Sequence, residues 1–449
     1  MNVTEQLSER IVATSYDSLS EEAIAAARRL VLDGIAIALA GVKEEAIRIL
    51  AAHYRAMEAR PEATALGLGL RTSPTLAAAL NGASMHVLDF EPMWAPPNHA
   101  LSTTLPALLA LVERQPVGGR DLIAGLVKGI EIQGWIRQAS HEYDTGSMRF
   151  HPPGLVGPMG SAAAAGHVLG LNAQQMAHAL GIASSRCGGM AANIGTMTKC
   201  THCGQAAMVG LESAMLAAAG FTANPEPFES FNGYGKMMLG SSFVAEDLLN
   251  FGPPFRIVQP GYAVKMFPSQ FGTHFAITAG LTLHSQIADP GEIRAVTLTT
   301  PVMEYVNRPH PETGLSGKFS LQYTFATALL RGAVKIDSFS DKRVRDPDIV
   351  ALLDKITLEM SPRIPARFDQ MHVEAHVMLA DGRNLHALCD GPPGIWGTPP
   401  ISEAEHLVKV RDCLYGHVSH DKAEALIELA RQVETLDAAG IRQLIQLAA

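Results

Sequence analysis

The feature that most constrains the fold is a succession of alanine- and glycine-rich helical segments, which fills the chain as far as about residue 250. The first, SEEAIAAARRLVLDGIAIALAG, opens at Ser20, a good helix N-cap, ends at Gly41 and has apolar residues at helical spacing. GRDLIAGLVKGIEIQGWI, GSAAAAGHVLGL and GQAAMVGLESAMLAAAGF repeat this pattern. Small side chains let helix axes approach closely. No constant repeat connects the segments, which disfavours a helical solenoid.

The pattern changes after residue 255. Residues 293–302 (IRAVTLTTPV) and 369–385 (DQMHVEAHVMLADGRNL) alternate in polarity and contain β-branched side chains, as strands do. Ala380-Asp381-Gly382 supplies a hairpin turn signal within the second stretch. Residues 319–332 (FSLQYTFATALLRG), between these strands, have a helical pattern. Such a mixture predicts an α+β module.

The proline- and glycine-rich stretch GPPGIWGTPPIS, residues 391–402, indicates a linker, after which the chain returns to helical patterns. We therefore predict a mainly α protein with a second domain inserted into the first. A large all-helical domain is expected from residues 1–262 and 398–449. A smaller α+β lid domain is expected from residues 263–397.

Charge and composition exclude several classes of protein. The formal net charge of −9 argues against a nucleic-acid partner, although a local group of cations could still bind an acidic substrate. The most apolar stretch, residues 31–43, contains Asp33 and is shorter than the roughly 20 residues of a membrane span. No signal peptide is visible, and five cysteines without framework spacing fit reduced thiols. We expect a cytoplasmic protein that binds neither membrane nor nucleic acid.

Cys200 and Cys203 form a C-x-x-C pair within GTMTKCTHCGQAA, residues 195–207. A structural zinc site needs about four ligands, and no second C-x-x-C is present. A thioredoxin-type pair should lie where a strand runs into a helix, whereas this one lies among helical patterns. We therefore expect buried, apolar cysteines and no metal or other cofactor.

Lys199 precedes the first cysteine and His202 lies between the two. If a helix begins near Thr198, the lysine and the histidine are three residues apart and share a face. Lys199 would then occupy the first turn, where the helix dipole disfavours a cation. A lysine at that position requires an anion or a lowered pKa, unless it simply faces solvent.

Four further clusters place ionisable side chains among glycine and proline, the composition of functional loops. They are MHVLDFEPMWAPPNHA, RFHPPG, GYAVKMFPSQFGTH and YVNRPHP, at residues 85–100, 149–154, 261–274 and 305–311. A lone histidine is usually structural. Several such loops together favour a shared cleft that binds polyanions.

The same stretches resemble the MmgE/PrpD family, which includes 2-methylcitrate dehydratase, cis-aconitate decarboxylase and iminodisuccinate epimerase. The resemblance covers nearly the whole chain. It is most specific in FHPPGLVGPMGSAAAAGHVLGLN, ALGIASS and GTMTKCTHCGQAAMVGLESAMLAAAGFT, with further matches in KMFPSQFGTH, YVNRP and FSLQYTFATALL. It implies a large helical domain, a smaller lid, an active site in the cleft between them, a homodimer, and no metal or organic cofactor.

The resemblance also implies roles for individual residues. Those expected to be catalytic are His99, Lys199, Asp89 and His151. Those expected to bind the substrate carboxylates or line the pocket are Lys265, Tyr305, Arg308 and His202. His99 and Lys199 are the expected acid/base pair on opposite walls, with Asp89 orienting or charging a neighbour.

The first family motif is altered in this chain. The family pattern D-x-D-D-T, followed by H-P, reads here Asp89-Phe90-Glu91-Pro92-Met93, then His99-Ala100. Pro92 and Met93 thus replace polar residues, which weakens the case for dehydratase and decarboxylase substrates. The prediction is therefore a cofactor-independent epimerase of a multi-carboxylate such as iminodisuccinate, working by proton removal and return beside a carboxylate.

Two alternatives stay open. One is a dehydratase or decarboxylase of a tricarboxylic acid of the 2-methylcitrate or cis-aconitate type. The other belongs to a different class, a helical binding protein without catalysis. The lysine and histidine motifs in separate loops count against the second.

Overall fold

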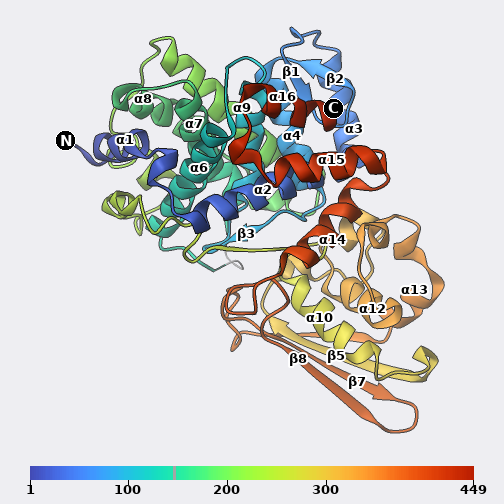
Figure 1. The fold of residues 1–449 in the computed structure, drawn as a ribbon. Helices are drawn as coiled ribbons and strands as arrows, with labels where there is room; N and C mark the ends of the chain where they lie inside the picture. Colours follow the sequence, from blue (N-terminus) through green and yellow to red (C-terminus); the bar gives the residue numbers. More distant parts are fainter. Residues whose placement is uncertain (145–147) are drawn as a thin grey trace.

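A computed structural model describes residues 1–144 and 148–449. Figure 1 shows a large helical part and, below it, a smaller part built around a sheet. Both chain ends lie in the helical part. Among the described residues, no helix combines the length and hydrophobicity needed to cross a membrane.

Within the described residues, the helical part begins with the helices α1 to α9. Their bounds are α1 Val3–Ala13, α2 Glu21–Gly41, α3 Glu45–Arg55, α4 Pro74–Val87, α5 Ala100–Leu111, α6 Gly119–Ala139, α7 Pro152–Val168, α8 Ala173–Ser184 and α9 Thr198–Ala218. The side chain of Ser20 caps α2 by accepting a hydrogen bond from the Ala23 N–H, as its sequence predicts. The protein is mainly α, as predicted, and within this helical part the short strands β1 Ala63–Ala65 and β2 Leu70–Thr72 form a hairpin.

Glycines permit the closest helix crossing in this part. A Cβ at Gly204 of α9 would lie 2.2 Å from the carbonyl oxygen of Ala79 in α4, a distance that no side chain could adopt. A Cβ at the facing position on α4, Gly82, would lie 2.9 Å from the Gly204 Cα, which is also too close. This contact brings the end of α4, which includes His86, to the start of α9, which includes Lys199.

The smaller part contains α10 Thr273–His284, α11 Gly314–Gly317, α12 Leu321–Arg331 and α13 Pro347–Leu353, with β5 Ile293–Pro301, β6 Ile356–Ser361, β7 Val373–Leu379 and β8 Asn384–Cys389. The sheet order is β6-β5-β7-β8. β5 and β6 are parallel, whereas β5–β7 and β7–β8 are antiparallel. The predicted strands at 293–302 and 369–385 correspond to β5 and to the β7–β8 hairpin, but β6 was not predicted. α10 packs against β7 and β8 and against α12.

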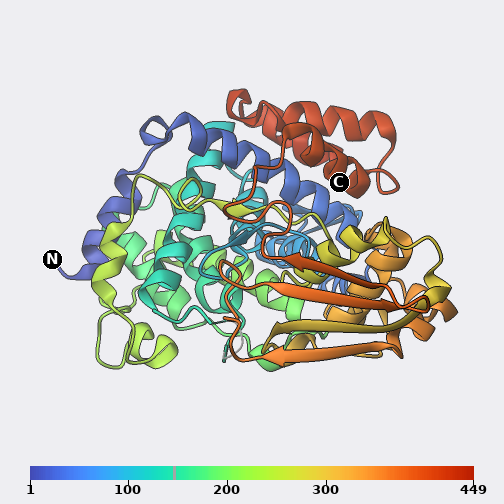
Figure 2. The ribbon, with the colours of Figure 1, turned by 90° about the horizontal axis from the view of Figure 1, so that it is seen from below.

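The remaining short strands, β3 Met93–Trp94 and β4 Tyr262–Ala263, pair with each other where the chain passes between the two parts. The last helices, α14 Glu403–Leu414, α15 His420–Ala430 and α16 Ala438–Leu447, return to the helical part. Figure 2 shows them lying over α2. A buried Asp33 on α2 binds His406 and Lys409 of α14, at 2.9 and 3.0 Å.

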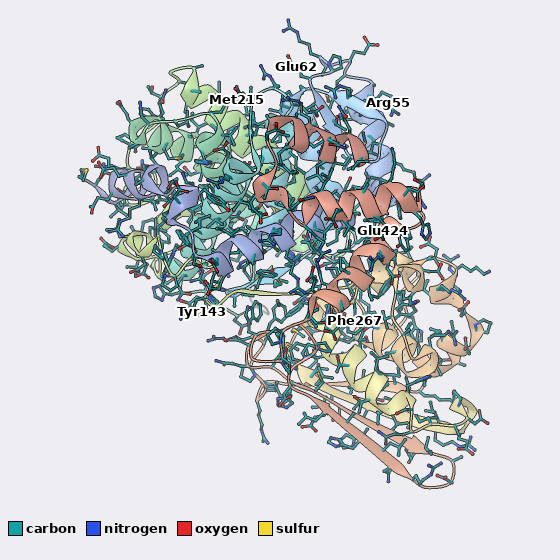
Figure 3. The ribbon with its side chains drawn as sticks, viewed as in Figure 1. Arg55, Glu62, Tyr143, Met215, Phe267 and Glu424 are labelled. Atoms are coloured by element: carbon teal, nitrogen blue, oxygen red, sulfur yellow. The ribbon has the colours of Figure 1, made fainter. Side chains whose placement is uncertain are left out.

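Buried hydrophobic side chains form two large clusters. One extends over residues 7–257 and 410–448, and the other over residues 263–395 together with Met93. The surface between the two parts is filled by side chains, with Tyr143 and Phe267 labelled near it in Figure 3. The chain therefore folds around two cores, and the loops at their boundary contain the polar clusters noted in the sequence.

Candidate active site

The site is centred on Asp89, just beyond the end of α4. Its backbone is left-handed, with φ of +52°, an uncommon conformation that Asp tolerates better than most residues. Two buried lysines hold this turn. Lys265 donates to the Asp89 carbonyl at 2.8 Å, and Lys409 donates to the Phe90 carbonyl at 3.0 Å. The conformation of the Asp89 loop is thus set from both the lid side and the C-terminal helices.

The Asp89 carboxylate lies between two ammonium groups. Lys199 Nζ is 2.5 Å from Oδ2, and Lys265 Nζ binds Oδ1. Burial alone would raise the pKa of Asp89, but Lys199 and Lys265 outweigh it and hold that pKa well below its usual range. The helix position of Lys199 required an anion, and Asp89 supplies it.

A second buried carboxylate, Glu91, joins two histidines. Its Oε1 hydrogen-bonds to His86 Nδ1, lies 3.2 Å from His99 Nδ1 in an ion-pair contact, and accepts from Ser102 Oγ at 3.0 Å. His86 Nε2 lies 2.9 Å from Lys199 Nζ. Burial lowers the pKa of His86 to about 4 and also lowers that of His99, despite the neighbouring Glu91. Both imidazoles are therefore neutral at neutral pH.

His151 and His202 complete the histidine cluster. His151 stands at the N-terminus of α7, and its Nδ1 lies 3.2 Å from Nδ1 of His202 on α9. Its ring centroid is 5.2 Å from that of His86 and 5.9 Å from that of His99. Burial, followed by the charge of Lys199, holds the pKa of His151 well below its usual value. The cluster thus offers neutral imidazoles beside a cation.

An inner cavity of about 40 Å³ lies against these groups. Its polar lining is Asp89, Asn98, His99, His151, Lys199, Gln270 and Tyr305, and its apolar lining is Met93, Pro97, Met148, Pro152, Pro153, Ile194, Phe271 and Phe368. Pockets that bind small molecules typically measure about 300–1,000 Å³, so the cavity as it stands is too small for a polycarboxylate. It must widen before such a ligand can enter.

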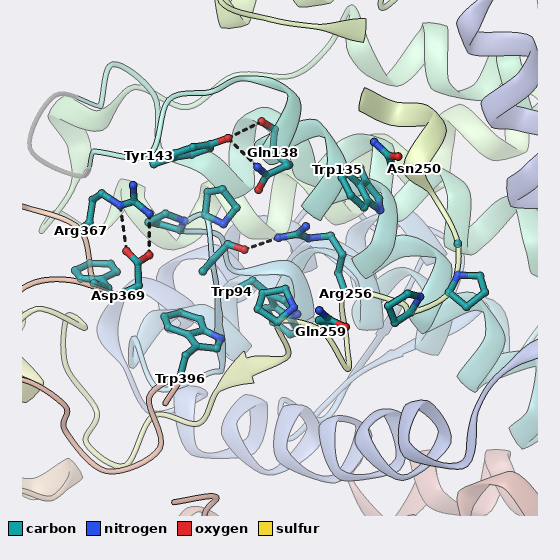
Figure 4. A pocket seen from close by; sticks show the side chains of 18 residues that line it. Trp94, Trp135, Gln138, Tyr143, Asn250, Arg256, Gln259, Arg367, Asp369 and Trp396 are labelled. Atoms are coloured by element: carbon teal, nitrogen blue, oxygen red, sulfur yellow. Dashed lines mark hydrogen bonds and ion pairs between the residues drawn. The ribbon is translucent and has the colours of Figure 1, made fainter. Parts of the chain in front are cut away.

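An outer cavity of about 630 Å³ adjoins the inner one, and the two share Pro97 and Phe368. Figure 4 shows its aromatic and cationic lining, which includes Trp94, Trp135, Tyr143, Trp396, Arg256 and Arg367. Arg256 donates to the Ala95 carbonyl at 2.6 Å, and Arg367 pairs with Asp369 at 2.7 Å. Loops from both parts of the molecule therefore form its walls.

A rear cavity of about 560 Å³ reaches the site from another direction. It shares Asp89 and Lys199 with the inner cavity and is also lined by His86. Its rim includes exposed residues such as Lys43 and Thr313. Lys199 thus borders two separate cavities.

The predicted site residues fall into two groups: those that line the inner cavity and those that do not. Of the described residues, Asp89, His99, His151, Lys199 and Tyr305 line the inner cavity, whereas Lys265, His202 and Arg308 do not. Lys265 is fully buried and binds the Asp89 carboxylate. Arg308 donates to the Ile194 carbonyl at 3.2 Å and to Ser316 Oγ at 3.3 Å, which fastens the lid to the loop before α9.

Sequence reasoning missed His86 and Glu91. Both lie in the stretch 85–100 that was recognised as a polar cluster, but only Asp89 and His99 were selected from it. A signal was present, because His86, Asp89 and Glu91 are ionisable residues within six positions of an otherwise apolar helix end. Their burial could not be read from that pattern.

Two cysteines lie beside the charged centre, with Cys203 Sγ within 4.8 Å of ligand atoms of His86 and Glu91. Cys200 and Cys203 are buried, and burial raises the pKa of Cys200 to about 12 and that of Cys203 well above its usual value. Such thiols stay protonated at neutral pH, which makes them poor nucleophiles. This is consistent with the apolar role expected for them.

Comparison with known proteins places this site in a family. Residues 5–246 match the MmgE/PrpD N-terminal domain and residues 267–435 match the MmgE/PrpD C-terminal domain. Cis-aconitate decarboxylase from Mus musculus is 31% identical, over 97% of this chain and 91% of the relative. The Homo sapiens enzyme of that name is 30% identical over 97% and 92%, and 2-methylcitrate dehydratase from Salmonella typhimurium is 25% identical over 67% and 66%. Since the two models together match most of the chain, and Asp89 and Lys199 lie within the N-terminal match, the chain belongs to the MmgE/PrpD family.

Proposed function

We propose that this protein is a lyase that removes carbon dioxide from cis-aconitate or a closely similar tricarboxylate. The proposal is supported most directly by the two animal relatives named cis-aconitate decarboxylase, which align over 97% of the chain. The enzyme class predicted from the sequence, an isomerase, finds no support among these relatives. They favour the alternative that the sequence left open.

The reaction makes two demands that the site can meet. The bond between a substrate carbon and one of its carboxylates breaks, and that carboxylate leaves as carbon dioxide. The electron pair of the bond stays on the substrate, where it is delocalised toward a remaining carboxylate. An enzyme acid then adds one proton to the resulting carbanion. Lys199 borders the inner cavity beside the neutral rings of His99 and His151, and we assign the proton transfer to Lys199.

The apolar lining gives the proposal a second support. Met93, Phe271 and Phe368 line the cavity opposite these polar groups, and each is at least nine-tenths buried. A carboxylate held against such side chains loses hydration, whereas carbon dioxide is uncharged and tolerates them. Met93, which seemed from sequence to count against decarboxylation, is therefore compatible with it.

Substrate entry requires the lid to move. We propose that the unit predicted at residues 263–397 opens about the helical part, because loops of both line the inner cavity. The outer cavity offers the approach, since it adjoins the inner cavity at Pro97 and Phe368 and Arg256 lies in its wall. Attraction between the Arg256 guanidinium and a tricarboxylate would raise the local concentration of the substrate in this cavity.

Turnover in heavy water, followed by NMR, tests the assignment. The protein is incubated separately with cis-aconitate, 2-methylcitrate and a chiral iminodisuccinate, and released carbon dioxide is measured in parallel. We expect carbon dioxide from cis-aconitate together with one deuterium in the product. A new alkene from 2-methylcitrate without carbon dioxide would indicate a dehydratase. Deuterium exchange at a stereocentre without loss of either molecule would restore the epimerase.

A further inference from the structure

We propose that Glu91 and His86 are positioning residues for the reaction, acting through the two groups on either side of them. Glu91 accepts the Nδ1–H of both His86 and His99, which turns the Nε2 lone pair of His86 toward Lys199 and that of His99 toward the inner cavity. This rests on the proposed function only in that it concerns the same site. The arrangement of protons that it states can be measured without substrate.

The positions of the four side chains define these roles. Among the described residues, His99 and Lys199 line the inner cavity, whereas His86 lines only the rear cavity and Glu91 lines neither. Glu91 is fully buried. Since neither His86 nor Glu91 borders the inner cavity, any influence on a substrate there must pass through His99 and Lys199.

The protons follow from the chemistry of a carboxylate. Burial alone would raise the pKa of Glu91, but His86 and His99 outweigh it and keep that pKa well below its usual value. Ionised Glu91 can only accept hydrogen bonds. His86 Nδ1 and Ser102 Oγ hydrogen-bond to Oε1, whereas His99 Nδ1 lies 3.2 Å from the same oxygen without meeting hydrogen-bond geometry. Because lone pairs on nitrogen and oxygen would repel at these distances, each ring is expected to present its Nδ1 hydrogen to Oε1. The two neutral rings then have unprotonated Nε2 atoms.

The Nε2 atoms of His86 and His99 lie near two different groups of the site. His86 Nε2 lies 2.9 Å from Lys199 Nζ, where it accepts from the ammonium and fixes its direction. His99 Nε2 faces the inner cavity side, 3.9 Å from Asp89 Oδ1. A carboxylate that fixes the tautomer of one catalytic histidine is well known in acyl transfer. Here one carboxylate serves two histidines.

Glu91→Gln is the decisive variant, because an amide of the same shape has one accepting oxygen and one donating nitrogen. With the amide nitrogen in the place of Oε1 it can accept from neither ring, and with the amide oxygen there the hydrogen bonds from both rings lose the negative charge that strengthens them, so in either orientation the Nδ1–H tautomers are held less firmly. We expect kcat with cis-aconitate to fall at least ~10²-fold, KM to change little and the melting temperature to stay close to that of the wild type. Glu91→Asp, which keeps the charge, should recover part of the loss.

The matched control is Val87→Ala, which trims a buried neighbour of His86 in the rear cavity without touching the hydrogen-bonded chain. It should keep near-normal turnover. Glu91→Gln with wild-type kcat would overturn the inference. So would a loss of activity that only follows a loss of folded protein, with no recovery in Glu91→Asp.

A second measurement needs neither a variant nor a substrate. NMR of the wild-type protein with 15N-labelled histidine reports which ring nitrogen of His86 and His99 is protonated. We expect hydrogen on Nδ1 and none on Nε2 in both rings, and the opposite tautomer in either ring would overturn the inference. If the protein released no carbon dioxide from cis-aconitate, the proposed function would fail while this measurement still decided the inference.

Discussion

Replacing Lys265 by methionine tests the buried charge arrangement on which the site is built. Lys265 is fully buried and donates to the Asp89 carboxylate, to the Asp89 carbonyl at 2.8 Å and to the Ser269 carbonyl at 3.1 Å. Methionine has a similar length but no charge. In the variant, Asp89 keeps Lys199 as its remaining ammonium partner within the described part of the chain.

The expected loss of unfolding free energy depends on how much of the Asp89 charge is left uncompensated. Removing one partner of a buried ion pair typically costs about 3–5 kcal/mol of unfolding free energy. Lys199 stays 2.5 Å from Asp89 and compensates part of the charge, so we expect the lower end, about 3 kcal/mol. Asp89→Asn combined with Lys265→Met removes both charges. That pair should recover about 1–3 kcal/mol relative to the sum of the single changes.

Urea unfolding followed by circular dichroism measures these free energies, and Lys318→Met is the matched control. Lys318 is just as buried, but it pairs at 3.1 Å with Glu44, whose side chain is 32% exposed. Water can hydrate Glu44 once the lysine is gone, so that change should cost about 1 kcal/mol or less. Equal losses in the two variants would refute the reasoning, as would additive effects of Asp89→Asn and Lys265→Met.

Four further predictions concern the same centre. Lys199→Ala should lower turnover at least ~10²-fold, and Lys199→Arg nearly as much if the lysine transfers protons, since arginine does not readily release one; near-normal turnover in the alanine variant would remove Lys199 from the mechanism. Chelator treatment and Cys200→Ser with Cys203→Ser should leave activity intact, and stoichiometric zinc lost together with activity would contradict this. The folded-state pKa values of Asp89 and Glu91 are depressed, so their stabilisation is present above the unfolded values near ~4 and is lost as the pH falls below them. The melting temperature should therefore drop more steeply on acidification in the wild type than in Asp89→Asn. Size-exclusion chromatography with light scattering should show the homodimer that the family resemblance implies.

Local sequence was sufficient for the features that depend on neighbouring residues. Ser20 and the apolar spacing after it predicted α2, and the alternation around Ala380-Asp381-Gly382 predicted the β7–β8 hairpin. Lys199 in the first turn of α9 indicated a nearby anion, a lowered pKa or exposure to solvent, and the structure places Asp89 beside it. These inferences succeeded because capping, side-chain period and the helix dipole act within a few residues. The choice of His99 and His151 depended on the family resemblance.

Only the tertiary structure decided which charges meet. Asp89 is 110 residues from Lys199 and 176 from Lys265 in sequence, and no local pattern states that both ammonium groups reach one carboxylate. The glycines of α4 and α9 bring His86 to Lys199, and the segment that leads into the smaller part places Lys265 against Asp89. Lys265 was predicted to bind a substrate carboxylate because the sequence shows the charge of the lysine but does not show which group lies against it. Burial makes that partner decisive, since an ion removed from water must find its compensation within about one hydrogen-bond length.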